Sequence, residues 1–161
     1  MARSDITIRV EELRWRNCGV PAGRVRVAAR LALARGLAQA GDSARNDKRS
    51  LTVLLADDER LRALNRRFRG KDSPTNVLSF PAPANGEGYL GDVAIGFDTV
   101  AREAAVAEKG LADHVLHLTV HGVLHLLGYD HSRTPEARIM EHLEIAVLRD
   151  LGVPNPYTAQ P

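Results

Sequence analysis

The sequence contains a single cysteine, Cys18, among its 161 residues. One cysteine cannot form an internal disulfide, and it excludes metal sites built from several cysteines. Any metal ion must therefore be held by histidine and carboxylate side chains. Because disulfides are typical of secreted proteins, their exclusion agrees with a cytoplasmic location.

Long apolar runs are also absent. No stretch approaches the ~20 residues that a membrane-spanning helix requires. Charges at Arg3, Asp5 and Arg9 interrupt the N-terminus, where a signal peptide would need an apolar core. We therefore expect a cytoplasmic protein with no membrane partner. Repeats and linkers are absent too, so we expect one domain over residues 1–161, ordered from about 5 to 157.

The net charge of +2 conceals an uneven distribution. Residues 1–80 carry 17 Lys and Arg against 9 Asp and Glu, whereas residues 81–161 carry 5 against 11. Nearly all of the early cations are arginines, whose planar fork can donate two hydrogen bonds to one phosphate. The N-terminal half is therefore either a polyanion-binding surface or a set of solvated arginines on helix faces.

Hydrophobic periodicity predicts an α+β fold. Alternating or short apolar runs predict strands over 5–12, 51–56, 77–80 and 89–97. Amphipathic patterns predict helices over 22–39, 58–68, 99–109, 112–127 and 135–150. The interpretation is a single domain with a small mixed β-sheet of about four strands, packed with about five helices.

Capping residues and turns refine the helix boundaries. Asp57 or Asp58 can cap the helix over 58–68, whose apolar face carries Leu61, Leu64 and Phe68. Thr134 is expected to cap the last helix, with proline at its first position. The tail from residue 155 is expected to fray.

Three of the six histidines fall within HGVLHLLGYDH, residues 121–131. His121 and His125 are four residues apart, so on a helix they lie on one face, about 6 Å apart, and can share a metal ion. Gly128 tolerates the left-handed conformation that ends a helix, so His131 can fold back as a third ligand. Three protein ligands leave a position for water, which is typical of catalytic zinc.

Similar spacing occurs in H-E-x-x-H-x-x-G-x-x-H metal hydrolases, which carry a glutamate after the first histidine. Gly122 occupies that position here, which argues against a metal peptidase with the same general base. A glycine there would leave room for a bulkier substrate near the metal.

Other histidines leave alternatives open. Four of them, at positions 114, 117, 121 and 125, share one helical stripe, so His117 and His121 are a second formal ligand pair. The offset to Gly128 favours His121 with His125. We expect His114 and His117 to support the ligands or to pack, and Asp130 either to orient a ligand or to cap the loop. His142 is expected on the surface and Met140 in the core.

A second group of residues lies in LNRRFRGKDSPTNVLSFP, residues 64–81. Arg66, Arg67, Arg69 and Lys71 cluster there, just before a turn and a short strand. The cluster is either a basic helix end that suits the helix dipole or a set of cations that meets a phosphate near the metal.

Together these stretches resemble the YbeY family of metal-dependent single-strand endoribonucleases and rRNA maturation factors. The resemblance rests on the 64–81 and 121–131 motifs with GDVAI at 91–95 between them. It implies an α+β fold, one Zn²⁺ per chain held by His121, His125 and His131, and a functional arginine at Arg69. It also implies small-subunit rRNA 3′-end processing and ribosome quality control, with single-stranded RNA, the small ribosomal subunit and its assembly factors as partners.

The resulting hypothesis is hydrolysis of a phosphodiester in single-stranded RNA, with the three histidines and Arg69 as catalytic residues. Weaker candidates are Arg66, Arg67, Lys71 and Ser79 for substrate binding, and Asp92, His114, His117 and Asp130 for support around the ligands. Ser79 and Asp92 can instead simply hold the site in place. The alternative is a ribosome assembly factor that binds pre-rRNA and has a mainly structural zinc.

Overall fold

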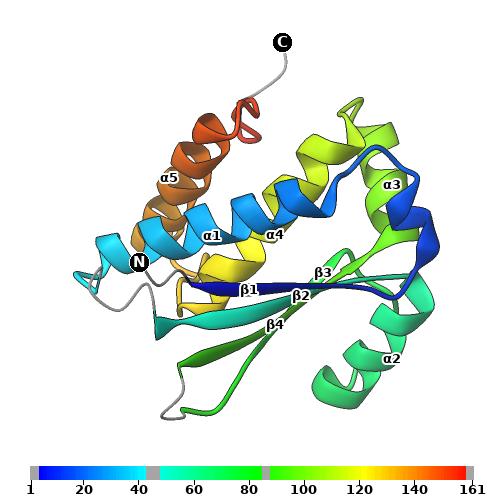
Figure 1. The fold of residues 1–161 in the computed structure, drawn as a ribbon, viewed down its shortest axis with the longest axis horizontal. Coiled ribbons are helices and arrows are strands. Elements are labelled where there is room, and N and C mark those ends of the chain that lie inside the picture. The colour runs from blue at the N-terminus through cyan, green and yellow to red at the C-terminus, as the bar shows by residue number, and fades with distance from the viewer. Residues whose placement is uncertain (1–3, 43–47, 85–87, 159–161) are drawn as a thin grey trace.

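The computed structural model describes residues 4–42, 48–84 and 88–158. Its strands form one sheet in the order β1-β2-β4-β3 (Figure 1). They are β1 (Asp5–Val10), β2 (Ser50–Ala56), β3 (Val77–Pro81) and β4 (Tyr89–Gly96). β1, β2 and β4 are parallel, and β3 runs antiparallel to β4 at one edge. The predicted mixed sheet is confirmed.

Within the described residues, five α-helices and one short 3-10 helix accompany this sheet. The α-helices are α1 (Ala22–Gln39), α2 (Asp58–Arg69), α3 (Phe97–Val106), α4 (Leu111–Leu126) and α5 (Thr134–Asp150). The α+β prediction is therefore confirmed. None of the helices in these ranges is long and apolar enough to cross a membrane.

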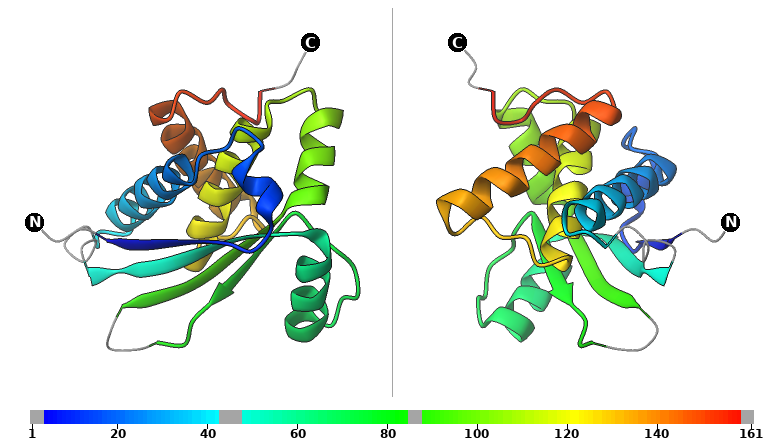
Figure 2. Two further views of the ribbon diagram at one scale, coloured as in Figure 1. Left: turned by 45° about the vertical axis from the view of Figure 1, so that its right-hand side comes forward. Right: turned by 90° about the vertical axis from the view of Figure 1, so that its left-hand side faces the viewer.

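The two faces of the sheet are covered by different helices. Strand alternation sends Val53, Val93 and Ile95 to the face that forms the main core with α1, α4 and α5. Ala94 and Leu78 point to the other face, where they pack against Leu61 of α2. Figure 2 shows α1, α4 and α5 on one side of the sheet and α2 on the other. Residues of α2 and α4 therefore belong to opposite faces.

The predicted strand over 5–12 is too long, because the chain turns into a short helix whose tryptophan is buried in the core. The chain leaves β1 at Val10 and forms the 3-10 helix η1 (Leu13–Arg16), which the sequence pattern did not predict. Trp15 of η1 is buried, and its Nε1 donates to the Ala56 carbonyl oxygen at 2.8 Å. The ring also meets Phe97 edge to face, with centroids 4.9 Å apart. Trp15 therefore fixes the end of β1 against β2 and α3.

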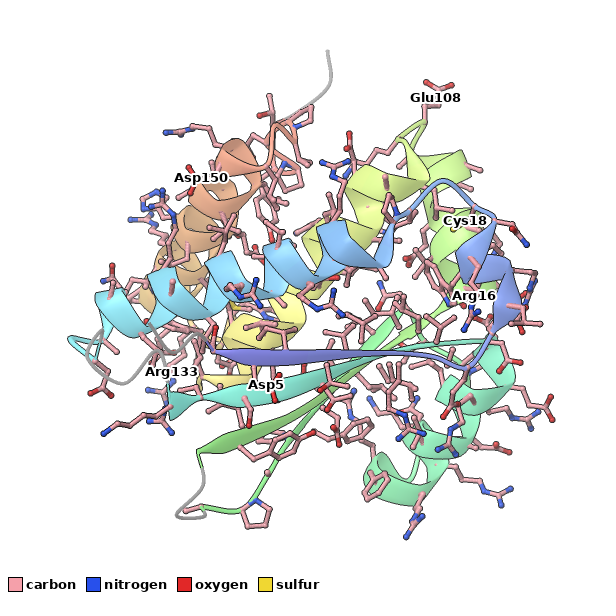
Figure 3. All side chains as sticks on the ribbon, in the orientation of Figure 1. Asp5, Arg16, Cys18, Glu108, Arg133 and Asp150 are labelled. Carbon is pink, nitrogen blue, oxygen red and sulfur yellow. The ribbon has the colours of Figure 1, made fainter. Side chains whose placement is uncertain are left out.

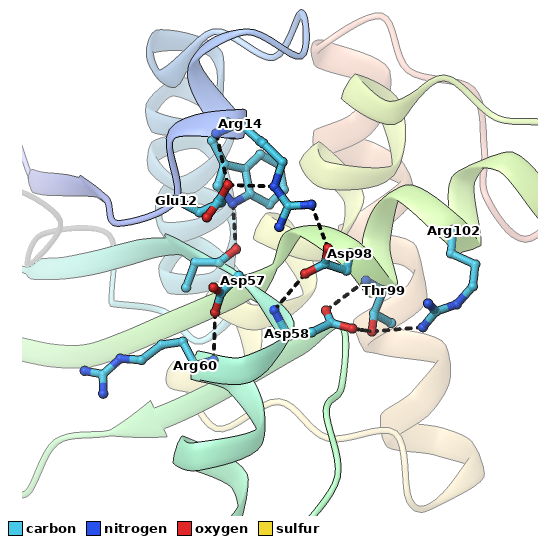
Figure 4. A network of polar contacts seen from close by, with 10 residues as sticks. Glu12, Arg14, Asp57, Asp58, Arg60, Asp98, Thr99 and Arg102 are labelled. Carbon is cyan, nitrogen blue, oxygen red and sulfur yellow. Dashed lines mark hydrogen bonds and ion pairs between the residues drawn. The ribbon is translucent and has the colours of Figure 1, made fainter.

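The N-termini of α2 and α3 cap each other (Figure 4). Asp57 is the N-cap of α2 as predicted, since its Oδ1 accepts from the Arg60 amide at 2.8 Å. Asp58 reaches across instead and accepts from the Thr99 amide and hydroxyl at 2.8 and 2.6 Å. In return, Asp98 accepts from the Asp58 amide at 3.1 Å. These bonds satisfy amide groups that helix ends leave unpaired, and they join α2 to α3.

Two smaller predictions differ from the structure. α5 begins at Thr134 itself, with Arg133 as its N-cap and no side-chain cap bond, so the predicted Thr134 cap is wrong. Phe68, expected on the apolar face of α2, is 57% exposed because it lines a surface groove, where its ring contacts Phe80 of β3 with centroids 5.1 Å apart. The single cysteine is distant from the start of α5. Figure 3 shows Cys18, between η1 and α1, far from Arg133, the N-cap of α5.

Candidate metal centre

The last two turns of α4 present two of the three predicted ligands. Most of α4 is buried, but His121 and His125 lie on a partly exposed stripe. Their Nε2 atoms are 3.0 Å apart, and their ring centroids are 4.6 Å apart. The exposed ring of His131 lies 5.3 Å from His121 and 5.2 Å from His125, centroid to centroid. The structure thus brings the three histidines together.

The loop after α4 is folded so that it returns His131 to the helix. Gly128 has φ = +94°, the backbone conformation that the sequence predicted for it. The Tyr129 amide donates to the Leu124 carbonyl at 3.1 Å, and the Tyr129 hydroxyl donates to the Gly36 carbonyl at 2.7 Å. Asp130 accepts from the His131 amide at 2.7 Å. Asp130 therefore caps the loop, which is one of its two expected roles.

These donors fit one cation. One ligand atom from each of His121, His125 and His131 lies within 4.8 Å of the others, and zinc–nitrogen bonds are about 2.0–2.1 Å. Burial, followed by the neighbouring His121 and His131, lowers the pKa of His125, which favours the neutral form that binds metals. Among the described residues, no fourth histidine, cysteine or carboxylate belongs to the group. The arrangement matches an open, catalytic-type site.

A buried carboxylate orients one of these ligands. Glu144 of α5 is 0% exposed, and its Oε1 accepts from His121 Nδ1 at 2.5 Å. Because Nδ1 carries the proton, Nε2 of His121 keeps its lone pair for a metal. The sequence interpretation missed Glu144. The available signal was its position in the apolar stripe of α5, among Met140, Leu143, Val147 and Leu148.

Tyr157 completes the surroundings of Glu144. Its hydroxyl donates to Glu144 Oε2, and its ring meets His117 edge to face with centroids 5.6 Å apart. Burial alone raises the pKa of Glu144, but the nearby His117 and the hydrogen bonds from His121 and Tyr157 outweigh it and lower that pKa to about 2. The expectation of a frayed tail from residue 155 is therefore wrong for the described part of the tail, which ends at residue 158.

The other residues expected near the ligands have separate partners. His114 Nε2 lies 3.0 Å from Glu103 Oε1, so it joins α4 to α3. The Ser79 hydroxyl donates to the Gly122 carbonyl at 2.9 Å and so joins β3 to α4. Met140 is buried and His142 is exposed, as predicted.

Gly122 does not leave the room that the sequence suggested. A Cβ atom at this position would lie 2.5 Å from Val93 Cγ1 and 3.3 Å from the Ser79 hydroxyl oxygen. The glycine therefore faces the sheet, and the expectation of space for substrate at this position is wrong.

The arginine cluster and the histidines lie on different faces of the sheet. Arg66, Arg67 and Arg69 end α2, which packs on the face opposite α4. All three are exposed, as is Lys71 in the following turn. The two faces meet at the edges of the sheet, one of which is strand β3. A substrate that contacts both groups would therefore have to reach from one face of the sheet to the other.

A groove of about 630 Å³ lies beside α2 on that second face. Its walls include Arg60, Arg67, Phe68 and Phe80, and the Arg67 guanidinium carbon lies 5.1 Å from the Phe68 ring centroid. Asp92 also lines the groove and accepts a hydrogen bond from the Tyr89 hydroxyl. The structure thus places Asp92 in this groove and not beside the three clustered histidines.

The fold and the site define a class: a small α+β protein whose three-histidine centre is built from one helix and the loop that follows it. The family model described as "Endoribonuclease YbeY" matches residues 25–152. The chain belongs to the endoribonuclease YbeY family.

Individual relatives agree with this assignment. The Endoribonuclease YbeY of Chelativorans sp. (strain BNC1) is 51% identical over 113 residues, which cover 67% of this chain and 69% of that protein. That of Rhodopseudomonas palustris (strain ATCC BAA-98 / CGA009) is 52% identical over 116 residues, 68% of this chain and 61% of the relative. The chain thus spans about three fifths to two thirds of these relatives.

A solved structure shows the same fold. The solution structure of TM1509 from Thermotoga maritima matches with a TM-score of 0.58 at 20% identity. The match covers 96% of this chain and 99% of the other. At this identity the likeness bears on the fold alone.

Proposed function

We propose that this chain is a zinc-dependent endoribonuclease that cleaves single-stranded RNA at the centre formed by His121, His125 and His131. The observation that carries the proposal is this open cluster, three nitrogen donors with no fourth protein ligand among the described residues, in a member of an endoribonuclease family. A zinc ion held by these three histidines would supply an activated water and polarise a phosphate oxygen. One Zn²⁺ per chain would serve this role.

The chain's own residues would prepare the centre for that ion and for RNA. Glu144 orients His121, and Asp130 holds the loop that carries His131. His131 is exposed, so an RNA phosphate can approach the cluster from solvent.

Cations near β3 would bind the rest of the strand. Arg69 would neutralise charge on the phosphate, and Arg66, Arg67 and Lys71 would hold neighbouring phosphates. Phe68 and Phe80, with ring centroids 5.1 Å apart, line the groove on the same side of the sheet as α2. Aromatic faces stack on unpaired bases, which favours single-stranded RNA over duplex.

The proposed biological substrate is ribosomal RNA, with processing of the small-subunit rRNA 3′ end and ribosome quality control in the cytoplasm. Residues 1–161 would act as one domain, with the small ribosomal subunit and its assembly factors as partners. The family resemblance supports this part of the proposal, and the excess of cations in residues 1–80 is compatible with it.

The test combines metal analysis with RNA cleavage. His125→Ala is expected to lose bound zinc and cleavage together, whereas Arg69→Glu should keep zinc and lose cleavage. His142→Ala is the matched control, since His142 is an exposed histidine outside the cluster. Full cleavage by metal-free protein would overturn the mechanism. RNA binding with weak cleavage that none of these substitutions changes would favour the assembly factor with a structural zinc.

A further inference from the structure

We propose that the C-terminal segment is a working part of the metal centre: Tyr157 holds Glu144, and Glu144 holds His121 with its Nε2 directed to the metal. Both are assigned as positioning residues. The inference rests on the proposed function in one respect, because it takes the three histidines to be the metal ligands.

The first step concerns the carboxylate of Glu144. It lies in the interior between α4 and α5, and no lysine or arginine pairs with it among the ion pairs of the described residues. A buried carboxylate is costly unless donors surround it. Its donors are His121 at one oxygen and Tyr157 at the other, with His117 Nε2 3.7 Å from Oε1. Two of these three groups lie on α4 and one lies on the tail.

The second step concerns the ring of His121. A neutral imidazole carries its proton on one nitrogen only, and the partner of that nitrogen decides which one. Glu144 accepts from Nδ1, so Nε2 is left as the metal-binding atom. This hydrogen bond fixes both the ring orientation and the tautomer of His121. The Nε2 lone pair is therefore already directed to the metal position before an ion binds.

The third step concerns the order of the tail. Val153 is buried, which fixes the start of the tail against the core. The Tyr157 amide donates to Asn155 Oδ1 at 2.8 Å, which closes a turn after Pro154. The Tyr157 ring then rests on the edge of His117. The hydroxyl is thereby placed at the Glu144 oxygen that His121 does not use.

The test measures zinc affinity in metal-stripped protein by competition with a chromophoric chelator. Glu144→Gln keeps the size of the side chain but removes its charge, and we expect zinc to bind about 10–100-fold more weakly. Tyr157→Phe keeps the ring against His117 but removes the hydroxyl, and we expect a smaller loss in the same direction. Matched controls are Glu136→Gln, an exposed glutamate of α5, and Tyr89→Phe, a tyrosine of strand β4.

A second readout needs neither zinc nor RNA. Nitrogen NMR of the His121 ring in metal-free protein reports which nitrogen is protonated. We expect Nδ1–H in the wild type and a mixture of tautomers in Glu144→Gln. Thermal unfolding of each metal-free variant shows whether it is folded. If Glu144→Gln does not fold, Tyr157→Phe still tests the contact between the tail and Glu144. It removes only one oxygen atom, at a half-exposed residue.

The outcomes separate the two proposals. Wild-type zinc affinity in both Glu144→Gln and Tyr157→Phe would overturn the inference and leave the proposed function standing. Weak binding in Glu144→Gln with unchanged binding in Tyr157→Phe would overturn the role of the tail. A wild-type protein that binds no zinc would overturn the proposed function and, with it, this inference.

Discussion

Gly122 of α4 and Val93 of β4 approach so closely that a Cβ atom on Gly122 would lie 2.5 Å from Val93 Cγ1. The Ser79 hydroxyl adds a hydrogen bond to the Gly122 carbonyl on the same side of the helix. Close contact with the sheet therefore requires the absence of a side chain here, between His121 and His125, the two proposed ligands on α4. The position that holds a general base in H-E-x-x-H hydrolases is closed by packing, so proton transfer must depend on other groups.

This contact predicts that Gly122→Ala destabilises the protein, although alanine is the better helix former by about 1 kcal/mol. Val93 is β-branched and fully buried, so it cannot turn away from the new methyl group. Overpacking of this kind costs about 1–3 kcal/mol, so after the gain in helix propensity we expect a net loss of up to about 2 kcal/mol in urea unfolding. Gly23→Ala in α1 is the control, because a Cβ there meets no atom within 4 Å. Equal stability of the two variants would contradict the argument.

The reciprocal cap between α2 and α3 predicts a second stability effect. Asp58→Ala removes the acceptor of the Thr99 amide and hydroxyl, and we expect a loss of about 1 kcal/mol, within the 0.5–2 kcal/mol range of helix caps. Glu59→Ala alters the same turn of α2 at an exposed side chain and should change stability by less than about 0.5 kcal/mol. Hydrogen exchange should also quicken at the first turn of α3. Unchanged exchange there would show that Asp58 does not cap α3.

Asp98 predicts how stability depends on pH. Its hydrogen bond from Arg14, at 2.7 Å, is the main cause that lowers the pKa of Asp98, and the Asp58 amide adds to it. Because the pKa is lower in the folded state, this stabilisation is complete above the unfolded pKa of about 3.9 and is lost as the pH falls through the folded value. Solvent screening keeps the effect modest, since the Arg14 and Asp98 side chains are 48% and 38% exposed.

Asp98→Asn should therefore be less stable than the wild type at about pH 7, and the gap should narrow below about pH 4. Urea unfolding of both proteins across this range measures the gap. A gap of constant size from neutral to acidic pH would show that the charge of Asp98 contributes nothing.

Features set by neighbours in the chain could be predicted from the sequence, whereas features set by distant partners could not. The spacing of His121, His125 and His131 around Gly128 depends on helix geometry and one turn, so it could be predicted. Trp15 and Glu144 have partners 41 and 23 positions away, and only the packing of whole elements brings those partners together. Asp92 was expected near the ligands because it belongs to the GDVAI motif. The alternation of side chains along β4 instead directs it to the opposite face of the sheet, into the groove.

The groove beside α2 predicts a substitution that affects RNA binding alone. Phe68 is 57% exposed and contacts little of the core, so Phe68→Ser should fold normally. If a base stacks on it, single-stranded RNA should bind roughly 10-fold more weakly, in line with the 1–3 kcal/mol typical of such stacking. Bound zinc should not change. Leu13→Ser is the control, because Leu13 of η1 is also apolar and is 66% exposed. Equal RNA affinity in these two variants would exclude a base-binding role for Phe68.

Metal removal gives the last prediction, which follows from where the ligands lie. His121 and His125 belong to α4, and His131 belongs to the loop that leaves it, so an ion bound by all three would join the helix end to the loop. A ligand that binds the folded state at 100 times its Kd adds about 2.7 kcal/mol, which corresponds to a Tm rise of roughly 5–10 °C in a chain of this size. Chelation should therefore lower the wild-type Tm by that amount. His131→Ala should show almost no response, because its loop no longer contributes a ligand, whereas His142→Ala should respond like the wild type. If chelation lowers the Tm of His131→Ala as much as that of the wild type, His131 is not a ligand and the ion does not join the loop to α4.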